Sequence, residues 1–231
     1  MPYDMPTTAR YTLTEDRLAV RVSLPPAYPG TVTVDAVVLA GGRSSRLGGE
    51  PKAQLRIAGA TLVEHAVAAA SGCRQVVVVG DRMPGTLHAR ENPPFGGPGA
   101  GLAAGIRALD ADRVLPPADR ILVLACDVPN AARTVGVLLG SAFDGSDGLI
   151  AVDGEGRTQP LLALYSASAL REAIDRPDLD GISMRSLLSD LRLETVAVPS
   201  GSTDDVDTWA DVDRLGVERP AALNPSIERM A

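Results

Sequence analysis

Two cysteines, no long apolar run and no excess of basic residues exclude several classes of protein. Cys73 and Cys126 lie far apart without CxxC or Cys/His spacing, so we expect buried free thiols rather than a zinc site or a redox pair. The net charge of -7 argues against nucleic-acid binding, which needs clustered basic residues. No apolar run approaches the roughly eighteen residues of a membrane span, and residues 1–34 lack the basic start and apolar core of a signal peptide. We therefore expect a cytoplasmic protein with no membrane partner.

The composition is that of a single α/β domain. With 231 residues, of which 45% are hydrophobic and 22% charged, the chain can bury a sizeable core. A Pro/Gly-rich turn cluster, "LPPAYPGT", separates a leader with short β-like alternation from a regular pattern that begins at Val34. We predict an N-terminal extension of unknown role over residues 1–33 and the main domain over residues 34–231.

Continuous apolar strands alternate with helical segments through the main domain. This alternation predicts a mainly parallel sheet with helices on both faces and right-handed crossovers. In such sheets ligands bind beyond the carboxyl ends of the strands. That edge is expected to hold the glycines after the first strand, Asp127 and the Gly-rich end of the long loop 81–99. Strands are expected at 34–40, 75–80, 120–130, 147–153, 160–166 and 193–199, and helices at 60–71, 100–111, 167–175, 183–191 and 207–216.

The stretch "LAGGRSSRLGGEPK" follows the first strand and suits a polyphosphate. Gly41 and Gly42 let backbone N–H groups approach a bound group closely, and Arg43, Arg46 and Lys52 bring three cations to the same loop. Neither GxGxxG nor GxxxxGK[ST] fits, so a dehydrogenase or a P-loop ATPase is disfavoured. The alternative is an ordinary glycine turn with solvated charges.

The same stretch resembles the signature of the MobA-like nucleotidyltransferases, L-A-G-G-x-S-x-R-M-G-x-x-x-K. Leu47 stands in place of the usual methionine, and Pro51 replaces the aspartate common among the guanylyltransferases. In the family this loop wraps the NTP triphosphate, and neighbouring backbone amides read the base. The resemblance therefore implies that the nucleotide is bound by Leu39, Ala40, Gly41, Gly42, Arg46 and Lys52.

Two further segments resemble family motifs in the same order. "GGPGAGLAAGI" is similar to a G-P-x-x-G loop near the base and ribose, which implies nucleotide contacts for Gly97, Pro98 and Gly101. "LACDVP" is similar to a strand-end motif whose aspartate, here Asp127, binds Mg²⁺. The apolar strand offers another explanation, because Asp127 can be a polar stop to it.

The late segment "DVDTWADVDRL" resembles the family's N-x-N-T-P-E-[DE]-L. Asp205 and Asp207 stand where guanylyltransferases often have asparagine, and Trp209 replaces the proline. The resemblance implies that Asp207 is a second Mg²⁺ ligand, since a small hard cation prefers carboxylate oxygen. A helix N-cap is an equally good explanation for Asp207, and both roles are compatible.

The four motifs cover residues 34–216 and imply a three-layer Rossmann-like fold of the nucleotide-diphospho-sugar-transferase type. The implied enzyme is Mg²⁺-dependent and transfers GMP from GTP to the phosphate of molybdopterin, expelling pyrophosphate. Because a phosphate is already a nucleophile, positioning and charge neutralisation by the catalytic residues Arg46, Lys52 and Asp127 suffice, and neither His65 nor His88 need act.

Several alternatives remain open at this point. They are a cytidylyl- or guanylyltransferase acting on molybdopterin or on another small phosphorylated acceptor, such as a deazaflavin-cofactor precursor, and a nucleotide-binding module without turnover. Gln159 and Pro160 can line the acceptor side or simply start a strand after a turn. Products of such enzymes usually pass to a molybdoenzyme or a chaperone, but no sequence feature marks a docking surface for one.

Overall fold

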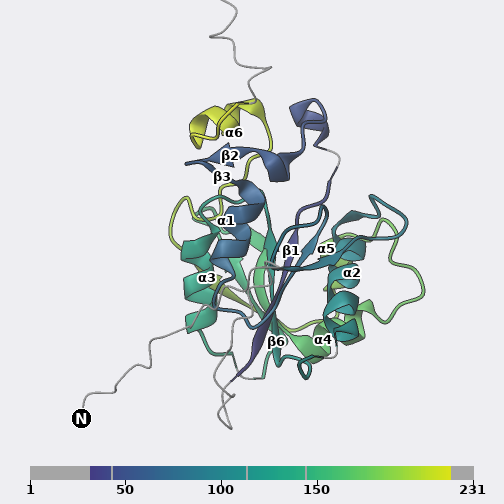
Figure 1. Ribbon diagram of the computed structural model, residues 1–231. Helices are drawn as coiled ribbons and strands as arrows, with labels where there is room; N and C mark the ends of the chain where they lie inside the picture. Colours follow the sequence, from purple (N-terminus) through teal and green to yellow (C-terminus); the bar gives the residue numbers. More distant parts are fainter. Residues whose placement is uncertain (1–31, 43, 113, 144, 220–231) are drawn as a thin grey trace, which may run out of the picture.

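The computed structural model describes residues 32–42, 44–112, 114–143 and 145–219. A seven-stranded sheet has the order β5-β4-β1-β6-β8-β7-β9 and carries helices on both faces (Figure 1). The predicted three-layer α/β fold is therefore confirmed. The strands of this sheet are β1 (Val34–Leu39), β4 (Val76–Val79), β5 (Leu87–Ala89), β6 (Arg120–Ala125), β7 (Gly148–Val152), β8 (Thr158–Ser166) and β9 (Leu193–Ala197).

Helices pack on both faces of the sheet, and they bury β1 and β4 on both sides. Val37 and Val77 pack into a core cluster with residues of α2, α4 and α5, whereas Val38 and Val78 pack into a second cluster with residues of α1 and α3. Burial on both faces explains the continuous apolar runs of these strands. The helices are α1 (Leu62–Ala69), α2 (Gly97–Ala111), α3 (Ala131–Gly140), α4 (Ala167–Ile174), α5 (Met184–Leu187) and α6 (Trp209–Arg214).

One strand reverses the direction of an otherwise parallel sheet. The pairs β1–β4, β1–β6, β4–β5 and β7–β9 are parallel, whereas β8 runs antiparallel between β6 and β7. The prediction of a mainly parallel sheet is confirmed with this exception. As a consequence, β8 begins at the edge where β1, β4, β6 and β7 end.

The structure contains elements that the sequence pattern did not predict. α3 was missed, and β5 lies within the segment 81–99 that was expected to be a loop. α2 begins at Gly97 rather than at residue 100, so Gly97, Pro98 and Gly101 lie in its first turns and not in a loop before it. Proline is tolerated there because the first N–H groups of a helix have no partner within the helix. A small hairpin, β2 (Arg56–Ile57) and β3 (Ala60–Thr61), was also missed.

The predicted helices at the carboxyl end of the chain are shorter than expected. The segment 183–191 contains the single turn α5, and 207–216 contains α6. The predicted extension 1–33 lies outside the described residues except for its last two positions, so the domain boundary stays a prediction. Within the described ranges, the structure contains no helix that is long and apolar enough to cross a membrane.

Glycine at position 105 lets α2 lie directly on the sheet. A Cβ at Gly105 would lie 2.6 Å from Cγ1 of Val37, which is fully buried, whereas a Cβ at Gly136 in α3 would meet nothing within 4 Å. We expect Gly105→Ala to destabilise the fold by about 1 kcal/mol or more, because crowding the core outweighs the helical gain. The matched variant Gly136→Ala should stabilise it by roughly 0.5–1 kcal/mol. Urea unfolding of both variants checks this, and equal stability of the two would contradict it.

Candidate active site

Two glycines allow β1 and β4 to end side by side. The Ala40 N–H donates to the Val79 carbonyl over 2.8 Å, and a Cβ at Gly80 would lie only 2.9 Å from the carbonyl carbon of Ala40. Gly42, with φ +146°, leaves the sheet in a conformation that L side chains rarely adopt. Gly41 and Gly42 are both exposed at this edge, where their backbone groups are accessible. Arg43 lies outside the described residues.

Leu47 anchors the loop from Gly41 to Lys52, called the glycine loop below. In the sequence it lies between Arg46 and Lys52. Leu47 is 1% exposed and packs in a small apolar cluster with Leu62 of α1, Val212 of α6 and Val206, which precedes α6. Leu47, which stands where the MobA-like signature has methionine, is therefore a core residue. Because this cluster joins the glycine loop to the segment around Val206, Arg46 and Lys52 come to lie beside the late acidic residues.

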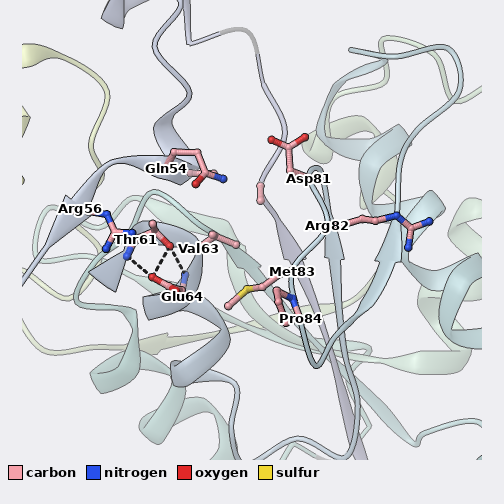
Figure 2. A pocket seen from close by; sticks show the side chains of 11 residues that line it. Gln54, Arg56, Thr61, Val63, Glu64, Asp81, Arg82, Met83 and Pro84 are labelled. Carbon is pink, nitrogen blue, oxygen red and sulfur yellow. Dashed lines mark hydrogen bonds between the residues drawn. The ribbon is translucent and has the colours of Figure 1, made fainter. Parts of the chain in front are cut away.

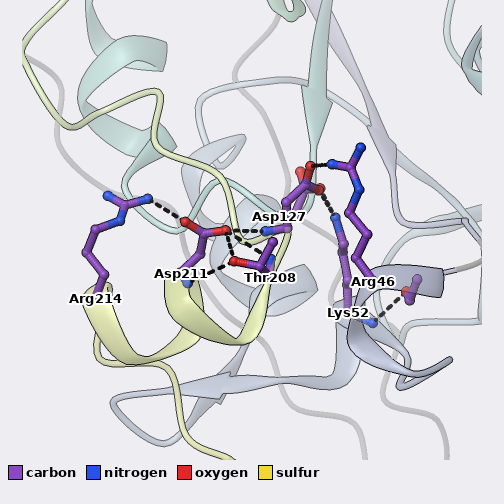
Figure 3. Close-up of polar contacts among 8 residues, drawn as sticks. Arg46, Lys52, Asp127, Thr208, Asp211 and Arg214 are labelled. Carbon is purple, nitrogen blue, oxygen red and sulfur yellow. Dashed lines mark hydrogen bonds and ion pairs between the residues drawn. The ribbon is translucent and has the colours of Figure 1, made fainter.

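Arg46, Lys52, Asp127 and Asp207 come together from three segments that are distant in the sequence. Figure 3 shows Arg46, Lys52 and Asp127 pointing toward one another. The Lys52 Nζ atom lies 3.2 Å from the Asp127 carboxylate and also contacts the Asp207 carboxylate. Arg46 is far more exposed, and its Nη1 atom lies 2.8 Å from the other oxygen of Asp207. The four side chains form one continuous set of ion pairs, so the residues singled out for phosphate and metal binding occupy one place.

Lys52 is the only lysine of the chain, whose remaining strongly basic side chains are all arginines. Burial by itself lowers the pKa of Lys52, but the hydrogen bond to Asp207 and the charge of Asp127 more than offset this, and the pKa is raised. Lys52 is therefore a cation at neutral pH. An ammonium is a compact point charge, which differs in shape from the planar guanidinium fork used elsewhere in this chain.

A third carboxylate, Asp205, joins the cluster and was not among the predicted metal ligands. Carboxylate oxygens of Asp127, Asp205 and Asp207 all lie within 4.8 Å of one another. The alternation Asp205-Val206-Asp207 is the sequence signal that indicates this role of Asp205. Buried Val206 packs in the apolar cluster, whereas the aspartates on either side of it reach the acidic cluster. Burial raises the pKa of Asp205, and the negative charges of Asp127 and Asp207 add to the effect. Three hard oxygen donors this close together suit Mg²⁺.

Backbone contacts hold these acidic residues in place. Asp127 lies two residues after the end of β6, and its carbonyl accepts the Val206 N–H over 2.9 Å. The N-cap of α6 is Thr208, which forms a capping box with Asp211, so the interpretation of Asp207 as the N-cap is wrong. The Asp207 carboxylate therefore faces the cluster rather than the helix end.

Removing the Thr208 cap should destabilise the segment that carries Asp205 and Asp207. We expect Thr208→Ala to cost about 1 kcal/mol at neutral pH, whereas Thr208→Ser, which keeps the hydroxyl, should be nearly neutral. Hydrogen bonds from Thr208 and Arg214 lower the pKa of Asp211 from 3.8 to about 2. A carboxyl with a lowered pKa stabilises the fold above its ordinary pKa and loses this effect as the pH falls through the lowered value.

The capping contribution of Asp211 should accordingly disappear between pH 3.8 and about 2. Urea unfolding of wild type, Thr208→Ala and Thr208→Ser at several pH values tests both statements. Equal stability of the alanine and serine variants at neutral pH would show that the hydroxyl does not cap α6.

The first turns of α2 approach the end of β1. Gly101 is buried, and a Cβ there would lie 3.4 Å from the Leu39 side chain, so this part of α2 packs against the end of β1. Gly97 has φ +88°, and Pro98 is exposed beside it. The structure thus places the second predicted nucleotide segment next to the first. Contacts of Leu39, Ala40, Gly97, Pro98 and Gly101 with a nucleotide stay predictions.

A cleft borders the glycine loop on the α1 side (Figure 2). Gln54 and Asp81 lie on opposite sides of it, and Ala40 contributes to its wall. Part of its polar lining is already engaged, because Thr61 and Glu64 form the capping box of α1. The cleft contains neither Lys52 nor Asp127, so it adjoins the ion-pair cluster without including it.

The histidines and cysteines stand apart from the cluster's ion pairs. The Nε2 atoms of His65 and His88 each lie 2.9 Å from a backbone carbonyl oxygen, those of Ile57 and Gly80. Cys73 and Cys126 are buried and free, as the sequence predicted. Burial raises the pKa of both thiols, that of Cys73 to about 12, so they stay protonated.

Solved structures of nucleotidyltransferases share this α/β fold. Among solved structures, a nucleotidyl transferase from Methanothermobacter superposes with a TM-score of 0.62 at 25% identity and covers 79% of this chain and 95% of its own. A molybdopterin-guanine dinucleotide biosynthesis protein A from Archaeoglobus fulgidus, at 22% identity and a TM-score of 0.56, shares the fold. It covers 78% of this chain and 95% of its own.

Sequence comparison identifies the family. Residues 36–196 match the model of the MobA-like NTP transferase domain. A molybdenum cofactor guanylyltransferase of Acidiphilium cryptum is 31% identical over 198 residues, which cover 81% of this chain and 96% of the relative. A probable molybdenum cofactor guanylyltransferase of Bacillus cereus is 30% identical over 187 residues, or 76% and 86% of the two chains. The chain belongs to the MobA-like NTP transferase family.

Proposed function

We propose that this protein is a Mg²⁺-dependent molybdenum cofactor guanylyltransferase that transfers GMP from GTP to the phosphate of molybdopterin. The observation that carries the proposal is the contact of Lys52 with both Asp127 and Asp207, which joins a phosphate-binding cation to a metal-binding cluster. The names of the relatives that align along most of the chain support guanylyl transfer and a molybdenum cofactor acceptor.

In the proposed reaction an oxygen of the acceptor phosphate forms a bond to the α-phosphorus of GTP. The bond between that phosphorus and the oxygen bridging to the β-phosphate breaks, and pyrophosphate leaves with the electron pair. Lys52 and Arg46 bind the triphosphate and stabilise the charge that builds up on the leaving pyrophosphate. Backbone N–H groups of Gly41 and Gly42 add dipoles to the same loop.

Asp127 and Asp207, together with Asp205, are proposed to hold Mg²⁺, because their oxygens lie close enough to share one cation. Bound there, the ion would neutralise phosphate oxygens as a Lewis acid. In the described structure Lys52 and Arg46 are paired with these same carboxylates. Binding of the metal and the nucleotide together would therefore exchange internal ion pairs for contacts with metal and phosphate.

Base and acceptor are tested by measuring pyrophosphate release with Mg²⁺ and each of GTP, CTP, ATP and UTP, without an acceptor, with molybdopterin or with a phosphorylated hydroxy acid. Release that requires both GTP and molybdopterin is expected. Release with CTP in place of GTP would identify a cytidylyltransferase, and release only with another phosphorylated acceptor would identify a different pathway. Tight nucleotide binding without release for any acceptor would favour a binding module.

A further inference from the structure

The register of the sheet carries the turn between β7 and β8 to the edge that holds the acidic cluster. Leu124 of β6 pairs with Leu162 of antiparallel β8, so the residues before Leu162 run alongside the residues after Leu124. Asp127 lies just beyond the end of β6. The register shifts between Ile150 and Ala151, and beyond the shift Gln159 and Thr158 pair with the last residues of β7. This interruption of the ladder sets the start of β8 apart from its regular part.

A single carboxylate organises this turn. The Asp153 side chain is 10% exposed and accepts hydrogen bonds from the backbone N–H groups of Glu155 and Arg157, from the Arg157 Nε atom and from the Gln159 amide. The four donor–acceptor distances lie between 2.9 and 3.2 Å. Two of the bonds shape the turn, and the other two fix the side chains of Arg157 and Gln159.

The Arg157 side chain stays largely exposed while it is held in this way. Its side chain is 69% exposed, and its further contact, with Glu155, involves a carboxylate that is 73% exposed. Such an exposed pair contributes little and is readily exchanged for a ligand. The hydrogen bond and charge of Asp153 raise the pKa of Arg157, Glu155 adds to this, and Asp205 of the acidic cluster contributes as well. Arg157 directly precedes β8, which begins at the edge where β6 ends, so Arg157 lies at the same edge as the cluster.

The acceptor in the proposed reaction needs a cation on this side of the site. In-line displacement places the attacking phosphate opposite the leaving pyrophosphate. Arg46 and Lys52 lie on the loop after β1 that would take the pyrophosphate, whereas the β7–β8 turn reaches the same edge beside β8, on the other side of β6 in the strand order. An acceptor phosphate bound there would be repelled by the carboxylates of Asp127, Asp205 and Asp207. A forked guanidinium at this side would offset that repulsion and bind phosphate oxygens in pairs.

We propose that Arg157 binds the phosphate of the acceptor, with Gln159 beside it and Asp153 as the residue that positions both. The inference rests on the proposed function and deepens it, since it restricts the acceptor to a phosphate monoester bound against the β7–β8 turn. Asp153 acts through Arg157 and Gln159 and does not contact the acceptor.

The test compares Arg157→Ala with Arg192→Ala. Arg192 is a matched control because it is 76% exposed and paired with Asp147, yet lies where β7 begins, at the opposite edge of the sheet. Arg157→Ala is expected to raise the acceptor KM roughly ten- to hundredfold. Its Kd for Mg-GTP, measured calorimetrically without acceptor, should match wild type. The acceptor KM of Arg157→Lys should lie between those of wild type and Arg157→Ala. Asp153→Asn should also raise the acceptor KM, and combining it with Arg157→Ala should raise this KM no further.

The acceptors used are molybdopterin and a phosphorylated hydroxy acid, so that the two proposals can fail separately. If wild type uses molybdopterin and Arg157→Ala has the acceptor KM of Arg192→Ala, the role of Arg157 is overturned while the proposed function stands. If wild type uses only the other acceptor and its KM depends on Arg157, the inference stands and the choice of molybdopterin fails. No turnover of either acceptor by wild type overturns both.

Discussion

Asp127→Asn is expected to lower kcat by about two to three orders of magnitude, because it weakens a site worth several kcal/mol of transition-state stabilisation. Asparagine has the same shape but carries no negative charge, so it is a poor ligand for Mg²⁺ and also leaves Lys52 with one carboxylate partner fewer. The Asp127 carbonyl, which accepts the Val206 N–H, is unchanged by the substitution. The fold should therefore be retained.

Steady-state kinetics across a Mg²⁺ titration, together with circular dichroism, measures this effect. Asp190→Asn is the control, since Asp190 is highly exposed and its contacts are an ion pair with Arg176 and a hydrogen bond from the Ser189 hydroxyl. Its kinetics should equal those of wild type. Near-normal Mg²⁺-dependent turnover by Asp127→Asn would remove Asp127 from the proposed metal site.

Lys52→Met is expected to lower kcat by roughly two to three orders of magnitude and to weaken Mg-GTP binding, because an aimed cation is lost where charge develops. Methionine keeps much of the length and apolar body of the side chain, so packing changes little. Lys52→Arg should restore only part of the activity, since the planar guanidinium cannot occupy the place of a compact ammonium between Asp127 and Asp207.

The unique lysine gives this prediction a second readout. An amine-specific reagent can modify only Lys52 and the chain's α-amino group, because there is no other lysine in the sequence. Saturating Mg-GTP should protect Lys52 from modification while the α-amino group reacts unchanged. Unaltered modification of Lys52 at saturating Mg-GTP, together with wild-type kinetics in Lys52→Met, would show that the triphosphate binds elsewhere.

The fold could be predicted where burial alone determines the pattern. β1, β4 and β6 are covered on both faces, so each is a continuous apolar run. β5 and α3 gave weaker signals. β5 is only three residues long and contains His88, and α3 contains exposed Gly136. Their structure depends on packing against neighbours that a local sequence window does not include.

The candidate site could be predicted in its residue types and only partly in its geometry. Motif order pointed to Lys52, Asp127 and Asp207, and these side chains are in contact. The sequence did not indicate how these side chains come together, because Leu47 anchors the loop through contacts with residues far along the chain. The N-cap was misplaced by one residue, since aspartate and threonine are both good caps and only the backbone distinguishes them.

The placement of the proposed acceptor side depends on the register of the sheet, which the sequence pattern did not indicate. Gln159 and Pro160 were predicted as candidates, but nothing local indicates that β8 reverses direction and starts at the edge that holds the acidic cluster. That reversal alone brings Arg157 toward the acidic cluster.

The central claim is that the α-phosphate of GTP is transferred, and following a label tests it most directly. The protein is incubated with Mg²⁺, molybdopterin and GTP radiolabelled at either the α- or the γ-phosphate, and the products are separated. The account predicts that α-label appears in a molybdopterin guanine dinucleotide and γ-label only in pyrophosphate. Transfer of γ-label to molybdopterin, or retention of both labels in GTP at every enzyme concentration, would contradict it.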